Sequence, residues 1–239
     1  GASVGSINNN SININNSSTD VNGIWANQTG ASAFTITGNT ISLTSNSTSP
    51  TQMLGISAGA TGPFQIYSNT FSALNLTGII TAAPVVSAIA VSAGTGNNVY
   101  SNHITNISVG AATSSASPVI DGILISGGTS TNLYKNKIQG ISSLCTGSTG
   151  VTNGIRISGG ITNQVYNNVI GNLTASASTS TDAIRGISIT STIANSTNNV
   201  YNNTVYITGA GGTNFGSSGI YHAASATSTT AALNIQNNM

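Results

Sequence analysis

Charge is nearly absent from this chain. Only 3% of its 239 residues are charged, whereas an ordinary globular domain carries about 25%. The four Lys and Arg residues and the three Asp residues are scattered, while proteins that bind nucleic acids concentrate Lys and Arg in a patch or stripe. Nucleic acid is therefore not an expected partner, and solubility must rest on Asn, Ser, Thr and Gly.

Cysteine, long apolar runs and strong helix formers are also scarce. Cys145 is the only cysteine, which excludes an internal disulfide framework or a cysteine-rich metal site, and we expect it to be a small buried hydrophobe. No apolar run approaches the roughly 18 residues that indicate a membrane-spanning helix. β-Branched Thr, Ile and Val are abundant, so the composition favours strands over helices.

What the chain does contain is a repeat. An apolar or aromatic residue, an Asn and an apolar residue recur with one free position between them, as in Tyr134-x-Asn136-x-Ile138. The marker residues are Asn10, Asn39, Asn69, Asn102, Asn136, Asn168, Asn203 and Asn237, and successive numbers differ by 29 to 35. A Gly-Ile step follows in phase at Gly23, Gly55, Gly122, Gly154, Gly186 and Gly219, with Ala88 in the remaining place. Two markers in phase indicate a repeat protein rather than a disordered low-complexity chain.

Each repeat predicts three short strands. Apolar and polar residues alternate, as at 107–109 and 155–157, which is typical of strands with one buried face. The first strand leads to the marker Asn, the second follows it as at 104–109, and the third contains the Gly-Ile step. Loops of Ser, Thr, Ala and Gly, such as 110–117, absorb the variation in repeat length. Such a repeat is too short for a propeller blade and lacks a leucine framework, so it predicts a parallel β-solenoid.

The marker Asn and a tyrosine two positions before it predict two columns. We expect the Asn at the bend between two strands, in the left-handed conformation, with its amide in a hydrogen-bonded ladder inside the solenoid. The tyrosines are Tyr67, Tyr100, Tyr134, Tyr166 and Tyr201. Because two positions separate Tyr from Asn, we expect both on the same side of the strand. The tyrosines would then form either a core-edge ladder or an exposed aromatic ladder that binds sugars or a neighbouring molecule.

These motifs resemble the right-handed parallel β-helix repeats of the pectin-lyase-like superfold. They are similar in particular to the Asn-x-Tyr-x-Asn-x-Ile repeats of large secreted surface and adhesin proteins of Gram-negative bacteria. The resemblance covers residues 1–239 and implies one all-β domain, a right-handed parallel β-helix of about seven to eight coils with three strands each. It implies a secreted or cell-surface location. It does not fix an activity, because that superfold carries lyases, hydrolases, adhesins and structural shafts.

The candidate catalytic residues do not assemble into a site. Hydrolysis of polysaccharides needs two carboxylates within about 10 Å, but Asp20, Asp121 and Asp182 fall on coils that lie two or three apart. We expect them to be turn residues. His103 and His222 occupy different phases of the repeat and are expected on the surface. We therefore expect no enzyme activity, no cofactor and no metal site.

The expected function is structural: the shaft of an extracellular adhesin or filament. The chain begins and ends in the same phase of the repeat without a capping segment, so its end coils should be covered by a second copy stacked head to tail or by further repeats. The alternative is a β-helix that binds or processes carbohydrate and whose active parts lie elsewhere. Its partner would be a cell-surface or environmental polysaccharide.

Overall fold

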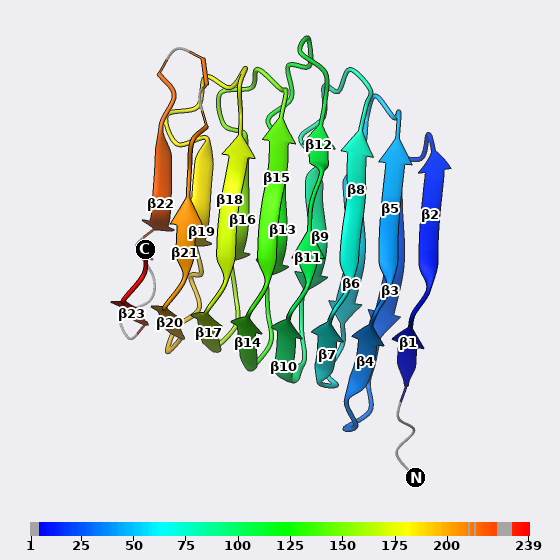
Figure 1. The fold of residues 1–239 in the computed structure, drawn as a ribbon, viewed down its shortest axis with the longest axis vertical. Helices are drawn as coiled ribbons and strands as arrows, with labels where there is room; N and C mark the ends of the chain where they lie inside the picture. The colour runs from blue at the N-terminus through cyan, green and yellow to red at the C-terminus, as the bar shows by residue number, and fades with distance from the viewer. Residues whose placement is uncertain (1–4, 210, 213, 224–230) are drawn as a thin grey trace.

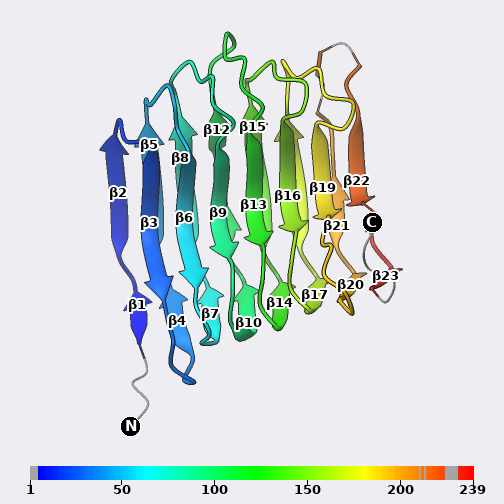
Figure 2. The ribbon, with the colours of Figure 1, turned by 180° about the vertical axis from the view of Figure 1, so that it is seen from behind.

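The computed structural model describes residues 5–209, 211–212, 214–223 and 231–239 and shows a parallel β-solenoid of about seven turns. In Figure 1 the chain runs up the near side, returns down the far side and advances from β2 towards β22, which is a right-handed path. Figure 2 shows the descending strands from behind. The predicted fold class is confirmed. The described segments form strands and turns, and none is a helix that could span a membrane.

Three parallel sheets make up the walls, and a complete coil contributes one strand to each sheet, except that one coil contributes both β11 and β12 to sheet B. Sheet A contains β1 (Ser6–Asn8), β4 (Phe34–Thr37), β7 (Phe64–Tyr67), β10 (Thr95–Tyr100), β14 (Ser130–Tyr134), β17 (Thr162–Tyr166), β20 (Thr197–Tyr201) and β23 (Ala232–Gln236). Sheet B contains β2 (Ser11–Asn16), β5 (Thr40–Ser45), β8 (Thr70–Leu76), β11 (His103–Ile104), β12 (Ile107–Val109), β15 (Lys137–Ser143), β18 (Val169–Thr174) and β21 (Thr204–Tyr206). Sheet C contains β3 (Asp20–Asn27), β6 (Gln52–Gly59), β9 (Val85–Val91), β13 (Val119–Ile125), β16 (Val151–Ile157), β19 (Ile184–Ile189) and β22 (Ser217–His222).

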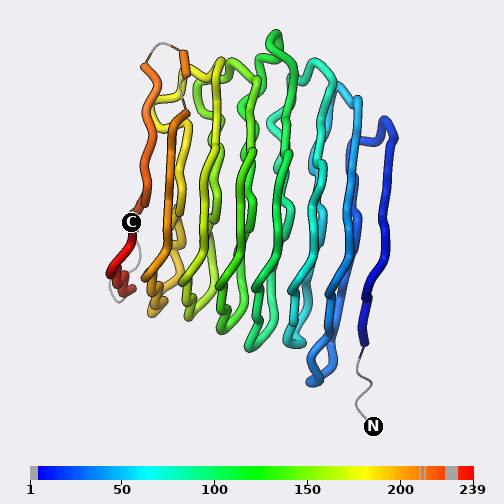
Figure 3. Tube along the Cα trace, viewed as in Figure 1, coloured from blue at the N-terminus to red at the C-terminus, as the bar shows by residue number. Residues whose placement is uncertain are grey.

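The core consists of columns in which like residues stack on like. One column on sheet C contains Ile24, Ile56, Ile89, Ile123, Ile155 and Ile187, each at most 4% exposed. Parallel strands in register place equivalent residues about 4.8 Å apart, so the same side-chain shape packs well in every coil. Burying one such side chain contributes about 1.5 to 3 kcal/mol. Figure 3 shows the coils lying side by side along the axis.

The Gly-Ile step marks an irregularity in sheet C. Between β13 and β16 the register passes from Asp121 opposite Asn153 to Ile123 opposite Ile155, which leaves Gly122 outside the pairing. A Cβ atom at Gly122 would lie 2.6 Å from the carbonyl oxygen of Gly154. A side chain therefore has no room at this position, which explains why glycine recurs there.

The bend before sheet B differs from the sequence prediction. The left-handed residue is the one that precedes the marker Asn, with φ between 54° and 57° at Ser68, Ser101, Lys135, Asn167 and Asn202. None of the markers from Asn10 to Asn203 adopts this conformation itself. Because the left-handed residue turns the chain, the tyrosine before it faces outward while the Asn after it is buried. The prediction that Tyr and Asn share one side was therefore wrong.

The marker Asn side chains form a hydrogen-bonded ladder inside this bend. Each Nδ2 donates to Oδ1 of the marker in the next coil at 2.9 to 3.0 Å, and the same Oδ1 accepts the preceding marker's backbone N–H at 3.0 to 3.1 Å. Nδ2 also donates to a carbonyl of the coil before, as from Asn136 to Val99 at 2.9 Å. The ladder contains Asn10, Asn39, Asn69, Asn102, Asn136, Asn168, Asn203 and Asn238.

The last member of the ladder is Asn238, so the prediction of Asn237 was wrong by one position. Strand β23 pairs with β20 so that Gln236 lies opposite Tyr201. Asn203 consequently bonds to Asn238, with Nδ2 donating to Oδ1 at 2.9 Å. Asn237 has a φ of 50° and takes the left-handed place that Asn202 holds one coil earlier. In the sequence the motif fits Asn237, which has Ile235 two positions before it and Met239 two positions after it, and only the strand register shows that Asn238 joins the ladder instead.

Replacing Asn136 by Leu should destabilise the protein by about 1 to 3 kcal/mol, because the buried amides of Asn102 and Asn168 lose a partner. The control is Asn132→Leu in the same coil, which alters a half-buried residue on the outer face and should change stability by no more than about 0.5 kcal/mol. Denaturant unfolding of both variants measures the difference. Equal midpoints for the two variants would show that the ladder does not stabilise the fold.

Candidate functional site

The outer face of sheet A presents two columns of side chains. Gln65, Asn98, Asn132, Gln164, Asn199 and Asn234 lie in register and form what we term the amide column. Tyr67, Tyr100, Tyr134, Tyr166 and Tyr201 lie in register two residues further along their strands and form the tyrosine column. Residues two apart on a strand point to the same side, so the columns run next to each other along the axis.

The tyrosine column is a continuous ring stack. Neighbouring ring centroids are 4.7 to 5.1 Å apart, and neighbouring ring planes differ by at most 10°. The rings are half-buried, because each ring covers the faces of its neighbours. Burial raises the pKa of Tyr100, and the adjoining phenols of Tyr134 and Tyr67 raise it further. Its hydroxyl therefore remains a hydrogen-bond donor at neutral pH.

The amide column carries neutral donors and acceptors. Asn132 Nδ2 donates to Asn98 Oδ1 at 2.9 Å, and Asn234 Nδ2 donates to Asn199 Oδ1 at 2.7 Å. Each bond uses one amide hydrogen of the donor and one oxygen lone pair of the acceptor, which leaves further capacity on the same groups. The column thus offers hydrogen bonds to a polar, uncharged ligand.

A hollow lies where the tyrosine stack ends. Gln236 is the register partner of Tyr201 in the next coil, so the ring face of Tyr201 that points away from Tyr166 adjoins an amide side chain. The hollow has a volume of about 270 Å³ and is lined by Gln164, Asn199, Tyr201, Asn234 and Gln236. It combines one aromatic surface with four uncharged amides.

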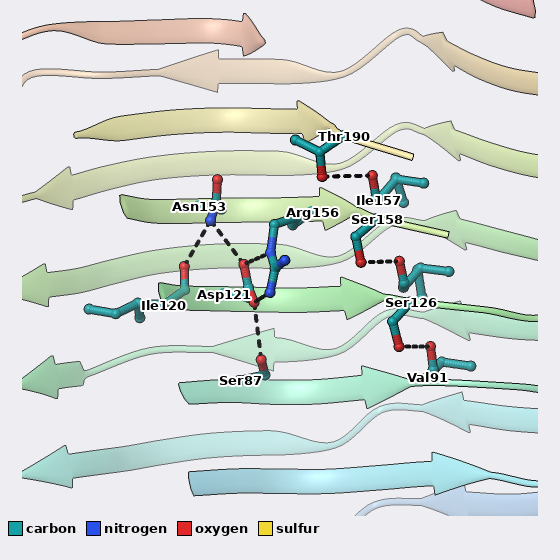
Figure 4. Close-up of polar contacts among 11 residues, drawn as sticks. Ser87, Val91, Ile120, Asp121, Ser126, Asn153, Arg156, Ile157, Ser158 and Thr190 are labelled. Carbon is teal, nitrogen blue, oxygen red and sulfur yellow. Dashed lines mark hydrogen bonds and ion pairs between the residues drawn. The ribbon is translucent and has the colours of Figure 1, made fainter. Parts of the chain in front are cut away.

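The outer face of sheet C holds a buried ion pair. Asp121 is fully buried and accepts hydrogen bonds from Arg156 Nε at 2.9 Å and Nη2 at 2.8 Å. Asn153 Nδ2 donates to the same carboxylate at 3.0 Å, and Ser87 Oγ donates at 3.3 Å. Figure 4 shows Asp121 between Ser87 on one side and Asn153 and Arg156 on the other. Four donor atoms satisfy the hydrogen-bonding capacity of this buried carboxylate.

The expectation that Asp121 is a turn residue was wrong, because it lies within β13. Its partner Arg156 follows it by 35 residues and comes close only through the pairing of β13 with β16. A signal was available in the sequence: Asp121 and Asn153 directly precede the repeated glycine, and Ser87 precedes the alanine that stands in its place. Aligning the Gly-Ile markers would have placed these three side chains in one column.

The other candidate residues lie apart from one another. Asp182 pairs with Arg185 at 2.9 Å, and the Arg185 guanidinium lies 3.6 Å from the ring centroid of Tyr221. Asp20 is exposed on β3, three strands from β13 in sheet C. The histidines, His103 on β11 and His222 on β22, are exposed and belong to different sheets. Within the described residues, no three His, Cys, Asp or Glu side chains gather where a metal ion could bind.

Two further polar groups occupy the interior. Cys145 is buried, as expected, and burial raises the pKa of its thiol. A second polar column, which the sequence analysis missed, contains Asn97, Thr131, Asn163 and Asn198 on the inner face of sheet A. Asn163 Nδ2 donates to Asn198 Oδ1 at 2.9 Å. The Asn or Thr that recurs three positions before the last four tyrosines of the tyrosine column was its signal in the sequence.

No family model, curated protein or solved structure matches this chain.

Proposed function

We propose that this chain is a non-enzymatic structural shaft, a stiff segment of an extracellular adhesin or filament. The observation that carries the proposal is the asparagine ladder, which joins successive coils from Asn10 to Asn238 through hydrogen bonds that are part-buried at its two ends and buried between them. The backbone bonds of the three sheets run along the same axis. Bending the rod would strain all of these columns together, so the arrangement suits a spacer that must keep its shape.

In the proposed shaft the ladders extend into further coils, which belong either to the same polypeptide or to another copy of it. The support lies in the bonding of each marker residue. Asn136 bonds Asn102 in the coil before and Asn168 in the coil after, so one coil is a template for the next. The extracellular location rests on the resemblance of the repeat to those of secreted surface proteins.

Electron microscopy of the native material, isolated from its source without unfolding, tests this proposal. We expect straight rods of uniform width whose length grows by about 4.8 Å for each coil. Rods assembled from Asn136→Leu protein are the comparison, and we expect them to bend more sharply because one rung of the ladder is lost. Compact particles without an elongated part would contradict the proposal.

A second candidate function is binding of a neutral polysaccharide along the outer face of sheet A. The observation that favours it is the hollow beside Tyr201, where one ring surface meets four amides. Aromatic rings present an apolar face to the C–H groups of a sugar, and amides both donate to and accept from its hydroxyls. The uncharged lining suits a neutral sugar better than an acidic one. The sugar would be held there without being cleaved.

Retention on neutral polysaccharide gels tests this second function. The wild-type chain should be retarded, and Tyr201→Ala should weaken the retention because it removes the ring surface of the hollow. Tyr206→Ala is the matched control, since Tyr206 is 67% exposed on sheet B and lies outside both columns. Equal retention of the two variants, or no retention of the wild type, would contradict the saccharide proposal. Release of new sugar ends would contradict the non-enzymatic assignment.

A further inference from the structure

The tyrosine column has a chemical property that neither stiffness nor sugar binding uses. Its phenol rings are half-buried and stacked with centroids 4.7 to 5.1 Å apart. We propose that this column is a site of oxidative cross-linking, at which neighbouring phenols couple to dityrosine and tie successive coils together covalently. The inference rests on ring geometry alone and does not depend on the shaft or saccharide proposals.

The geometry brings the reacting atoms of two rings together. A dityrosine bond joins the ring carbons next to the two hydroxyl groups. Tyr100 and Tyr134 lie in register on paired strands, their ring planes differ by 1° and their ring centroids are 4.8 Å apart, so equivalent atoms of the two rings lie close to each other. Rotation about the Cβ–Cγ bonds turns the edges of the two half-buried rings towards each other, and rotation about the Cα–Cβ bonds then closes the remaining distance. Reactants held in this way behave as if at very high concentration, so coupling within one molecule should outpace coupling between molecules.

The remaining described tyrosines provide an internal comparison. Tyr206 is 67% exposed, and its register partner on β18 is Gly171. The ring of Tyr221 lies beneath the guanidinium of Arg185 at 3.6 Å. Neither is stacked on the tyrosine column, which belongs to the outer face of another sheet. If exposure alone decided reactivity, Tyr206 would react first and would join separate molecules.

The reaction requires a one-electron oxidant, which we assign to the class of haem peroxidases acting with hydrogen peroxide. Two phenols each lose one electron and one phenolic proton, and the two radicals form a carbon–carbon bond. The hydrogen on each joined carbon then moves through solvent to the phenolic oxygen, which restores both aromatic rings. Peroxide accepts the two electrons and two protons and leaves as two water molecules. The protein is two hydrogen atoms lighter for each cross-link.

A cross-link would fasten one coil to the next. The joined residues are one repeat apart, as are Tyr67 and Tyr100, whose positions differ by 33. Closing a loop of that size restricts the unfolded chain and leaves the folded coils in place, as a disulfide does in the chain-entropy model. The oxidised protein should therefore unfold at a higher temperature than the untreated protein.

Treatment of dilute protein with hydrogen peroxide and a haem peroxidase tests the inference. We expect dityrosine fluorescence in protein that remains monomeric on a denaturing gel, with a mass lower by two hydrogen atoms for each cross-link. Peptide mapping should find the links between adjacent members of the tyrosine column. Absence of dityrosine, or links that join separate molecules through Tyr206, would overturn the inference.

A pair of double variants separates stacking from the mere presence of tyrosine. Tyr100→Phe with Tyr166→Phe keeps five aromatic rings but leaves the remaining phenols two coils apart, roughly 10 Å, and should abolish the intramolecular product. Tyr206→Phe with Tyr221→Phe should leave the product at the wild-type yield. Circular dichroism and the unfolding midpoint before oxidation check that both variants fold. Undiminished intramolecular coupling in the first double variant would also overturn the inference.

Discussion

The hydrogen bond between stacked asparagine side chains is the interaction on which the rest of this structure depends. A primary amide can donate and accept at once, so a column of identical amides can satisfy itself at any length. The markers from Asn39 to Asn203 are at most 1% exposed, and an unpaired amide at that depth would cost about 1 to 3 kcal/mol. The ladder is favourable only when every coil places its Asn next to the equivalent Asn of the neighbouring coil. It therefore fixes how the bends of successive coils align.

Register at the bend determines what appears on the surface. Once Asn102 and Asn136 are aligned, Tyr100 must lie opposite Tyr134 and Asn98 opposite Asn132. The tyrosine and amide columns are therefore consequences of the buried ladder, whatever ligand or oxidant they meet. The same alignment in sheet C places Asp121 beside Ser87 and Asn153, where a carboxylate can be buried because donors from both neighbouring coils reach it.

Periodicity in the sequence was sufficient to predict the three parallel sheets and the column of markers from Asn10 to Asn203. It was insufficient where a single residue decides the outcome. The choice between Asn237 and Asn238 depends on strand pairing at β23, and the outward direction of the tyrosines depends on a left-handed residue such as Ser101. The bond between Asp121 and Arg156 joins residues 35 positions apart, and it emerges only when the repeats are aligned residue by residue.

Hydrogen exchange of the asparagine side-chain amides measures whether the buried ladder is formed and stable in the folded protein. Nuclear magnetic resonance of the folded protein in heavy water can follow the Nδ2 hydrogens of Asn102 and Asn136. Those of Asn132, which lies on the outer face of the coil that contains Asn136, are the comparison. We expect the ladder hydrogens to exchange as slowly as the backbone amides of the core strands, and those of Asn132 to exchange much faster, because its half-buried side chain makes a single bond, to Asn98. Equally fast exchange at all three residues would contradict this expectation.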